Sequence, residues 1–316
     1  MGIPTSTWLT LTVKAAHFHR DSGSHRTGMV ALSNRSMHYV AVVRGKLKKG
    51  KATTTNLIAV GDDVWITPTS PTQAIIERIE ERHSKLSRRS PGRTPREQII
   101  AVNVDYGIIV MAAHAPDFNK NRLDRYIAAC SMGNVRPIIC INKIDLVDEG
   151  YVRAEMALYE RIGYSVIYTS AKTGQGLPEL CAVLKESVSA LVGSSGVGKS
   201  SLINAVQPDL GLKTNALREN FWKGQHTTTT AELLTLDMGG MVVDTPGMRE
   251  FALWHHEDGN AREDVAASFP DIEEAQSRCK FRNCSHTHEP GCEVKRLVEE
   301  GAIEHARYKN YVKLTR

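Results

Sequence analysis

The chain has 316 residues, of which 41% are hydrophobic and 24% charged, and these ordinary globular values exclude general disorder. No stretch approaches the roughly 18 consecutive apolar residues of a transmembrane helix, and we find no signal peptide, so we expect a cytoplasmic protein. Residues 1–100 hold 16 Lys and Arg against 7 Asp and Glu, whereas the remainder holds 24 against 28. This basic front module favours a polyanionic partner such as nucleic acid.

The front of the chain predicts a small β domain after an irregular leader. Residues 1–27 are polar and rich in Ser, Thr and His, and we expect no regular structure there. Short strands within about 60 residues favour a small closed barrel, and the basic run 44–51 favours the OB type. We therefore predict an OB-fold RNA-binding domain over residues 28–85. Its expected strands are 38–43, 63–67 (preceded by the apolar run 57–60) and 73–79.

The next segment is predicted to be a basic linker over residues 86–97. Six Lys and Arg and no acid occur in 82–96, and the Pro and Gly residues there break any helix. We expect this segment to contact phosphate groups.

From residue 98 apolar strands alternate with helical stretches. Such alternation predicts a mostly parallel sheet with helices on both faces, and we assign residues 98–255 to this α/β domain. The run 136–141 is almost continuously apolar, as expected for a strand buried on both faces. The expected strands are 99–104, 107–112, 136–141, 165–169 and 187–192, and the expected helices are 121–131, 149–162, 177–186 and 199–206.

A glycine-rich turn between strand 187–192 and helix 199–206 fits the P-loop pattern G-x-x-x-x-G-K-[ST]. Its glycines let backbone N–H groups converge on phosphate at a helix N-terminus. We expect Lys199 to contact the β- and γ-phosphates and to assist catalysis, and Ser200 to ligate Mg²⁺. The predicted phosphate-binding residues are Gly193, Ser194, Ser195, Gly196, Val197, Gly198, Lys199, Ser200 and Ser201.

Guanine specificity is predicted by the N-K-x-D run that ends strand 136–141. The Asp145 carboxylate can accept from the guanine N1–H and 2-amino groups, a pair that adenine does not offer, so an ATP-dependent kinase or ATPase is disfavoured. The Lys143 stem would pack along the base. A backbone N–H after the next strand would supply a second contact. The predicted base-binding residues are Asn142, Lys143, Ile144, Asp145, Ser170, Ala171 and Lys172.

Two further motifs follow the P-loop. Asp244 ends an apolar strand and opens a D-x-x-G motif, in which Asp244 would hold Mg²⁺ through water and the Gly247 N–H would sense the γ-phosphate. The run 224–229, G-Q-H-T-T-T, lies where switch I belongs, and Thr228 or Thr229 would complete the Mg²⁺ shell.

The residue that positions the attacking water is less clearly marked. Met248 stands where a Ras-like enzyme has its catalytic glutamine, so intrinsic hydrolysis should be slow. His226 is the candidate for positioning water instead, and a purely structural role for this histidine is equally open.

Three of the six cysteines crowd near two histidines close to the C-terminus, which in a reducing compartment indicates a metal site. Three thiolates and one imidazole form a closed tetrahedral Zn²⁺ set, structural because no coordination position stays open. His288 is the alternative to His286. With a helical stretch over 293–314, these residues predict a helical zinc-binding domain over 256–316. The predicted ligands are Cys279, Cys284, His286 and Cys292.

The order of the motifs is unusual. Ordinary small GTPases run P-loop, D-x-x-G, N-K-x-D, whereas here N-K-x-D begins at Asn142 and the P-loop at Gly193. Loops at the ends of parallel strands meet in space whatever the chain order, so the same site can be assembled by a circularly permuted chain.

These residues resemble the circularly permuted GTPases of the ribosome small subunit-dependent type (RsgA/YjeQ) over about residues 28–316. The resemblance implies an OB fold, a permuted GTPase domain and a zinc domain, with GTP hydrolysis stimulated by the small ribosomal subunit. The family usually has arginine where this chain has Gln225. The matching stretches are 44–47, 60–64, 101–105, 124–126, 142–145, 193–204, 224–229, 244–251 and 279–292.

We therefore expect a monomeric GTPase that uses GTP, Mg²⁺ and one structural Zn²⁺. It would bind the small (30S) ribosomal subunit and its 16S rRNA and assist late maturation. The alternative is an RNA-binding scaffold on the ribosome with a nucleotide switch and incidental hydrolysis, which Met248 favours.

Overall fold

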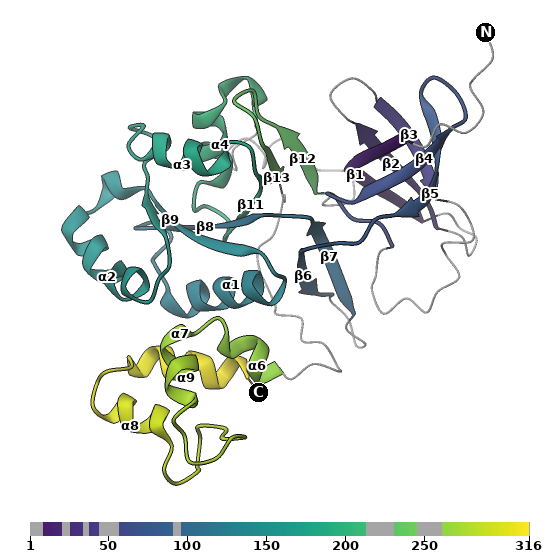
Figure 1. Ribbon diagram of the computed structural model, residues 1–316. Helices are drawn as coiled ribbons and strands as arrows, with labels where there is room; N and C mark the ends of the chain where they lie inside the picture. Colours follow the sequence, from purple (N-terminus) through teal and green to yellow (C-terminus); the bar gives the residue numbers. More distant parts are fainter. Residues whose placement is uncertain are drawn as a thin grey trace.

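The computed structural model describes residues 9–20, 26–33, 38–43, 57–90, 96–212, 231–244 and 261–315. A β unit and a helical C-terminal unit lie against different sides of a central α/β unit (Figure 1). Within the described residues, no helix combines the length and apolarity that crossing a bilayer requires.

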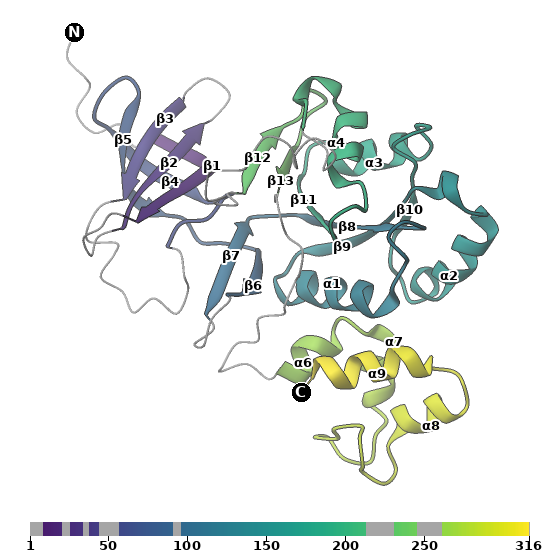
Figure 2. The same ribbon diagram turned by 180° about the vertical axis from the view of Figure 1, so that it is seen from behind.

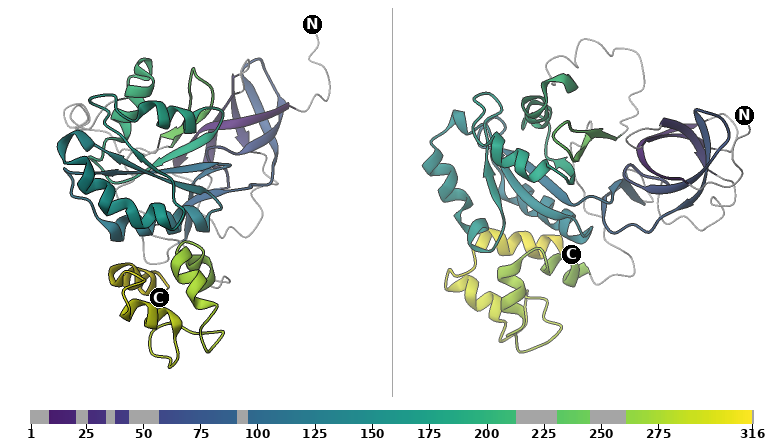
Figure 3. Two further views of the ribbon diagram at one scale, coloured as in Figure 1. Left: turned by 60° about the vertical axis from the view of Figure 1, so that its left-hand side comes forward. Right: turned by 45° about the horizontal axis from the view of Figure 1, so that its top comes forward.

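The β unit closes on itself. Strand β1 (Leu9–Arg20) pairs with β2 (Arg26–Ser33), β2 with β3 (His38–Val43), β3 with β5 (Gln73–Ile79), β5 with β4 (Asp63–Pro68), and β4 again with β1. Only the β3–β5 pair is parallel. The view from above shows these strands curving around one another (Figure 3). Alternate side chains fill the interior, namely Val13, Ala41, Ile58, Val64, Ile66, Ala74 and Ile76.

The prediction of an irregular leader over residues 1–27 is wrong for residues 9–20 and 26–27, which lie in β1 and β2. Strand β1 is held by partners distant in sequence, with Leu9 opposite Ile66 and Thr12 opposite Asp63. Polar composition hid these pairings, because a strand's partners lie outside the window that composition samples. The alternation from Leu9 to Val13 was a usable strand signal.

The predicted linker is largely a hairpin. Strand β6 (Lys85–Arg89) pairs antiparallel with β7 (Glu97–Val102), so residues 86–89 and 97 of the predicted linker are strand, while 91–95 lie outside the described residues. Leu86 is fully buried. The buried Glu97 accepts from Ser87 Oγ (2.7 Å) and pairs with Lys85 Nζ (2.8 Å). Cross-strand pairing thus satisfies charges that in sequence resembled a solvated linker.

The β unit joins the central unit through backbone contacts. Val60 bridges Ala101, and Asn103 Nδ2 donates to the Gly61 carbonyl (3.0 Å). Gly61 has φ 93°, and a Cβ there would lie 2.1 Å from the Val102 oxygen, so only glycine permits this approach. A second connection pairs Ala15 of β1 with Glu232, the first residue of β12 (Glu232–Thr235).

The central unit has the predicted α/β architecture. Its strands lie in the order β10-β9-β8-β11-β13-β12, all parallel except β12. Helices α1 and α2 cover one face, and α3 and α4 the other (Figures 1 and 2). The strands are β8 (Tyr106–Ala112), β9 (Arg136–Asn142), β10 (Val166–Tyr168), β11 (Val188–Val192) and β13 (Met241–Asp244). The helices are α1 (Lys120–Met132), α2 (Glu149–Arg161), α3 (Leu177–Leu184) and α4 (Lys199–Val206), with short 3₁₀ turns Ile144–Leu146 and Pro208–Leu210.

Burial on both faces explains the apolar runs. In β8, Ile109 and Met111 pack toward α1 and α2, whereas Ile108 and Val110 pack toward α3 and α4. The alternation follows from the two-residue period of a strand.

The C-terminal unit consists of α6 (Ala261–Ala266), α7 (Pro270–Gln276), α8 (Glu293–Glu299) and α9 (His305–Leu314) among the described residues. The sequence predicted helix throughout 293–314, but the structure divides it in two. Gly301 adopts φ 75°, and the Ala302 N–H bonds back to the Leu297 carbonyl (2.9 Å), which ends α8. Helix α9 lies beside α1 in both opposed views (Figures 1 and 2).

Candidate functional site

The predicted nucleotide motifs meet at one edge of the central sheet. β9 ends at Asn142, β11 at Val192 and β13 at Asp244, and these parallel strands share their carboxyl edge with β8 and β10. Ligands of open α/β sheets bind at this edge. Motifs separated along the chain therefore converge, as the permuted order requires.

The P-loop connects β11 to α4 through a backbone that only glycine adopts readily. Gly196 has φ 84° and Gly198 φ 100°. A Cβ on Gly198 would lie 2.2 Å from Asn142 Nδ2, so the absent side chain lets the P-loop touch the N-K-x-D segment. At the turn's start, a Cβ on Gly193 would lie 2.3 Å from the Val110 oxygen.

Asn142 connects the N-K-x-D motif to the P-loop and to the predicted base-binding segment 170–172. This buried side chain donates through Nδ2 to the Val197 carbonyl (2.9 Å) in the P-loop. Its Oδ1 accepts from the Ala171 N–H (3.2 Å) in the Ser170–Lys172 segment. The amide thus fixes the base-binding segments relative to the phosphate-binding turn.

Asp145 and Lys143 are held at the rim. Ser170 Oγ donates to Asp145 Oδ1 (2.6 Å), which orients the carboxylate. Lys143 has a left-handed backbone (φ 64°), and its Nζ donates to the Ala115 carbonyl. Ile144 is buried and anchors the segment to the core.

Lys199 lies across the P-loop. Its Nζ donates to the carbonyls of Gly193 (2.7 Å) and Ser194 (2.9 Å), so the ammonium is positioned over the turn. Ser200 follows in the first turn of α4, whose N-terminus contributes partial positive charge. The register of β13 beside β11 sets Ala190 opposite Val243, which puts Asp244 level with the end of β11.

A second cluster lies in the C-terminal unit. One ligand atom from each of Cys279, Cys284, His286 and Cys292 lies within 4.8 Å of all the others. His286 Nδ1 is 3.4 Å from Cys292 Sγ and 3.6 Å from Cys279 Sγ. His288 instead contacts Thr287 Oγ1 (2.9 Å) and is exposed. The structure therefore brings together the four residues that the sequence selected.

The backbone around this cluster is fixed by neighbours. His286 has φ 60°, and Tyr308 of α9 donates its hydroxyl to the His286 carbonyl (2.6 Å). Burial raises the pKa of the Cys284 thiol to about 12 and also raises the pKa of Cys292.

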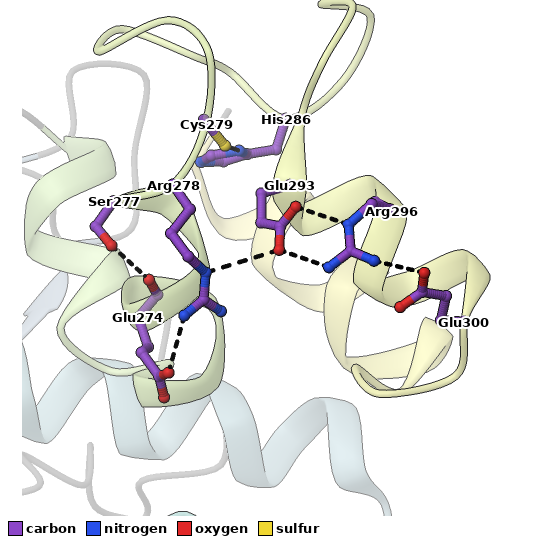
Figure 4. A network of polar contacts seen from close by, with 8 residues as sticks. All are labelled: Glu274, Ser277, Arg278, Cys279, His286, Glu293, Arg296 and Glu300. Carbon is purple, nitrogen blue, oxygen red and sulfur yellow. Dashed lines mark hydrogen bonds and ion pairs between the residues drawn. The ribbon is translucent and has the colours of Figure 1, made fainter.

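Ion pairs connect the residues on either side of this Cys and His cluster (Figure 4). Arg278 precedes the first cysteine and Glu293 follows the last, and Arg278 Nε lies 3.7 Å from Glu293 Oε1. Arg296 also pairs with Glu293 (2.7 Å), and its hydrogen bonds lower the pKa of that carboxyl. These pairs are partly exposed and contribute modestly to stability.

Comparison with known proteins agrees with this geometry. Residues 79–254 match the profile of the RsgA GTPase family. The chain belongs to the RsgA GTPase family. A relative from Gemmatimonas aurantiaca, named small ribosomal subunit biogenesis GTPase RsgA, is 42% identical over 279 residues, covering 87% of this chain and 89% of the relative. The protein of that name from Bacillus cereus is 40% identical over 271 residues, covering 85% and 86%.

Solved structures of this family have the same overall arrangement. The crystal structure of YjeQ from Thermotoga maritima aligns with a TM-score of 0.71 at 33% identity, covering 98% of each chain. YloQ, described as a circularly permuted GTPase, aligns with a TM-score of 0.66 at 30% identity, covering 98% of this chain and 94% of that one. The permuted motif order is thus shared with a solved structure.

Four of the predicted site residues are not described by the structure. His226, Thr228, Thr229 and Gly247 lie outside the described residues. Their roles remain predictions.

Sequence reasoning also missed a contact to the P-loop. Tyr126 of α1 is buried, and its hydroxyl lies 3.2 Å from Ser194 Oγ. The segment 124–126 was noted only as a matching stretch. A hydroxyl-bearing residue on the buried face of a predicted helix was the available signal, because buried hydroxyls usually find a partner.

Proposed function

We propose that this protein hydrolyses GTP on the small ribosomal subunit and assists late subunit maturation. The observation that carries the proposal is Asn142, which ties the guanine motif to the P-loop despite the permuted order. Support also comes from relatives named small ribosomal subunit biogenesis GTPases.

The phosphate end of the site would work through this chain's own groups. Lys199 and the P-loop N–H groups would neutralise charge on the phosphates, and Ser200 and Asp244 would hold Mg²⁺, which supplies further charge neutralisation when bound. His226 would position the attacking water. His226→Ala should then lower subunit-stimulated turnover while GTP affinity is unchanged.

The second cluster fits Zn²⁺. Three thiols and one imidazole in mutual reach make a complete tetrahedral donor set, and the donors come from the two ends and the middle of the segment 279–292. Bound zinc would act as a structural cross-link in a unit with a small apolar core. We assign Cys279, Cys284, His286 and Cys292 as the ligands.

The β unit is proposed as the RNA-binding module. Support for this proposal comes from the unit's closed ring of five paired strands, since an OB fold is a five-stranded barrel. The basic excess in the first 100 residues would contact 16S rRNA phosphates. As part of the same proposal, the protein acts as a cytoplasmic monomer.

Turnover tests the proposal directly. GTP hydrolysis by the purified protein is measured alone, with small subunits, and with large subunits or ATP as controls. We expect small subunits to stimulate GTP hydrolysis strongly and large subunits to have no such effect. Unchanged turnover with retained GTP binding would instead favour a ribosome-bound scaffold with incidental hydrolysis, the reading that Met248 supports.

A base-exchange variant tests the guanine contact. Asp145→Asn replaces an acceptor pair with an amide whose N–H₂ can donate to the 2-oxo group of xanthine, so preference should shift from GTP toward XTP. Asp148→Asn is the matched control, because Asp148 caps α2 by accepting from the Tyr151 N–H (3.0 Å), a role asparagine also performs. Unaltered base preference in Asp145→Asn would contradict the assignment.

A further inference from the structure

Helix α1 belongs to two cores at once. Leu123, Ile127 and Cys130 pack into the central unit against β8 and β9. Ala128 lies in the core of the C-terminal unit, and Met132 packs against that core. Ala128 and Met132 are four residues apart and so share one stripe of the helix, which faces the C-terminal unit.

The same stripe carries polar contacts. Four residues before Ala128, the Asp124 carboxylate is 1% exposed and accepts from Arg307 Nη1 (2.7 Å) and Asn310 Nδ2 (2.6 Å), both on α9. Four residues earlier still, Lys120 Nζ lies 3.4 Å from Glu304, next to α9. Buried charge-assisted hydrogen bonds are directional, so they fix the register of α9 on α1.

Helix α1 also contacts the P-loop, through Tyr126. The Tyr126 hydroxyl lies 3.2 Å from Ser194 Oγ. Both residues are buried, with 2% of Tyr126 and 9% of Ser194 exposed to solvent. The Ser194 carbonyl also accepts from Lys199 Nζ (2.9 Å). Tyr126 is two residues from Asp124 in α1, so less than one turn of helix separates the P-loop contact from the C-terminal unit.

We propose that Tyr126 is a positioning residue for the P-loop and that α1 couples nucleotide binding to docking of the C-terminal unit. Nucleotide phosphates fix the P-loop and with it Ser194. The buried hydroxyl pair then restrains α1, and the restrained helix holds Asp124 in place for Arg307 and Asn310. Coupling between two binding equilibria is reciprocal, so docking of α9 favours nucleotide binding by the same factor.

The coupling should be modest, because it depends on one pair of neutral hydroxyls. The net value of such a hydrogen bond limits the effect to roughly two- to tenfold in GDP affinity. No new conformation is needed, since a more rigid α1 alone gives the coupling.

Hydrogen exchange tests the inference on the full chain. Exchange of the α9 amides is measured with and without GDP, while fluorescent GDP reports affinity and metal analysis reports zinc content. In the parent protein GDP should slow α9 exchange several-fold. In Tyr126→Phe this GDP-dependent slowing should disappear and GDP affinity should fall about two- to tenfold.

Tyr164→Phe is the matched control. The Tyr164 hydroxyl donates to the Ser268 carbonyl (3.0 Å), so it joins the same two units without touching the P-loop. This variant should speed α9 exchange equally with and without GDP.

Two results would overturn the coupling. GDP could bind the parent protein without changing α9 exchange, or Tyr126→Phe could keep the full GDP effect. The second includes equal acceleration of α9 exchange with and without GDP, which would mean that Tyr126 acts through packing alone. Because GDP affinity is measured in the same samples, failure of the coupling is distinct from failure of the nucleotide site.

Discussion

Replacing Arg307 by methionine should undock the C-terminal unit. Arg307 is 2% exposed, with Nη1 2.7 Å from Asp124 and Nε 3.0 Å from Asp271, and its guanidinium lies 4.4 Å from the centre of the Phe269 ring. Arg307→Met keeps the apolar stem and removes the charge. Asp124 then stays buried without its cation, which costs about 3–5 kcal/mol.

Hydrogen exchange of α9 measures this cost, because it reports local opening free energies. A loss of about 3 kcal/mol should accelerate α9 exchange roughly 100-fold, whereas the core strands β8 and β9 should change little. Adding Asp124→Asn removes the buried charge. Its single amide oxygen can still accept from the Tyr159 hydroxyl, and its N–H₂ can donate to Asn310 once that amide turns over, so the double variant should recover much of the loss.

The effect should depend on pH with a definite sign. Burial raises the pKa of Asp124 even beside Arg307, and removal of the guanidinium raises it further. A carboxyl with a raised pKa in the folded state binds more protons when folded, so docking becomes more favourable as pH falls. The deficit of Arg307→Met should therefore shrink from pH 7 to pH 5. A pH-independent deficit, or a double variant no better than the single one, would refute the reasoning.

Three other perturbations follow from the packing. Gly198→Ala should weaken GTP binding about tenfold or more, because the new Cβ would lie 2.2 Å from Asn142 Nδ2. Gly211→Ala is the control: Gly211 also has a positive φ (54°), but its Cβ would have nothing within 4 Å, so GTP affinity should not change. Equal GTP affinities of the two variants in a fluorescent-nucleotide titration would count against the close approach. Chelating the metal should raise hydrogen exchange across 279–314 and leave the central sheet protected, and unchanged exchange after metal loss would contradict a structural ion. Burial raises the pKa of Cys130 from 9.0 to about 12 and of Cys140 to about 11, so the unfolded chain loses these protons first and the free energy of unfolding should fall from pH 9 to pH 11. Urea unfolding of Cys140→Val should show a smaller fall, and an identical one would argue against that thiol as a source.

The central unit was predictable because its signals are local. The strand 136–141 is apolar on both faces, and the P-loop and N-K-x-D motifs each occur within eight residues. Parallel strand ends then bring the motifs together without further information. The clustering of the four proposed metal ligands was predictable for the same reason, since Cys284 and His286 lie between Cys279 and Cys292 in the sequence.

What the sequence hid depends on distant partners. The pairing of β1 with β4 spans about fifty residues, and Glu97 resembled part of a linker until Lys85 and Ser87 were seen beside it. Asp124 meets Arg307 from the far end of the chain. No window of sequence contains both partners of such a pair, so neither composition nor periodicity can assign them.

The β unit and the C-terminal unit both attach to the central unit next to the nucleotide site. The β unit pairs through Ala15 with Glu232, which opens β12 directly after the predicted switch I run 224–229. The C-terminal unit attaches through Asp124 to α1, which also touches Ser194 of the P-loop. Each unit is therefore fastened to an element that adjoins the nucleotide site. If the proposed function holds, a small ribosomal subunit that bound both outer units would therefore contact two units attached next to the nucleotide site.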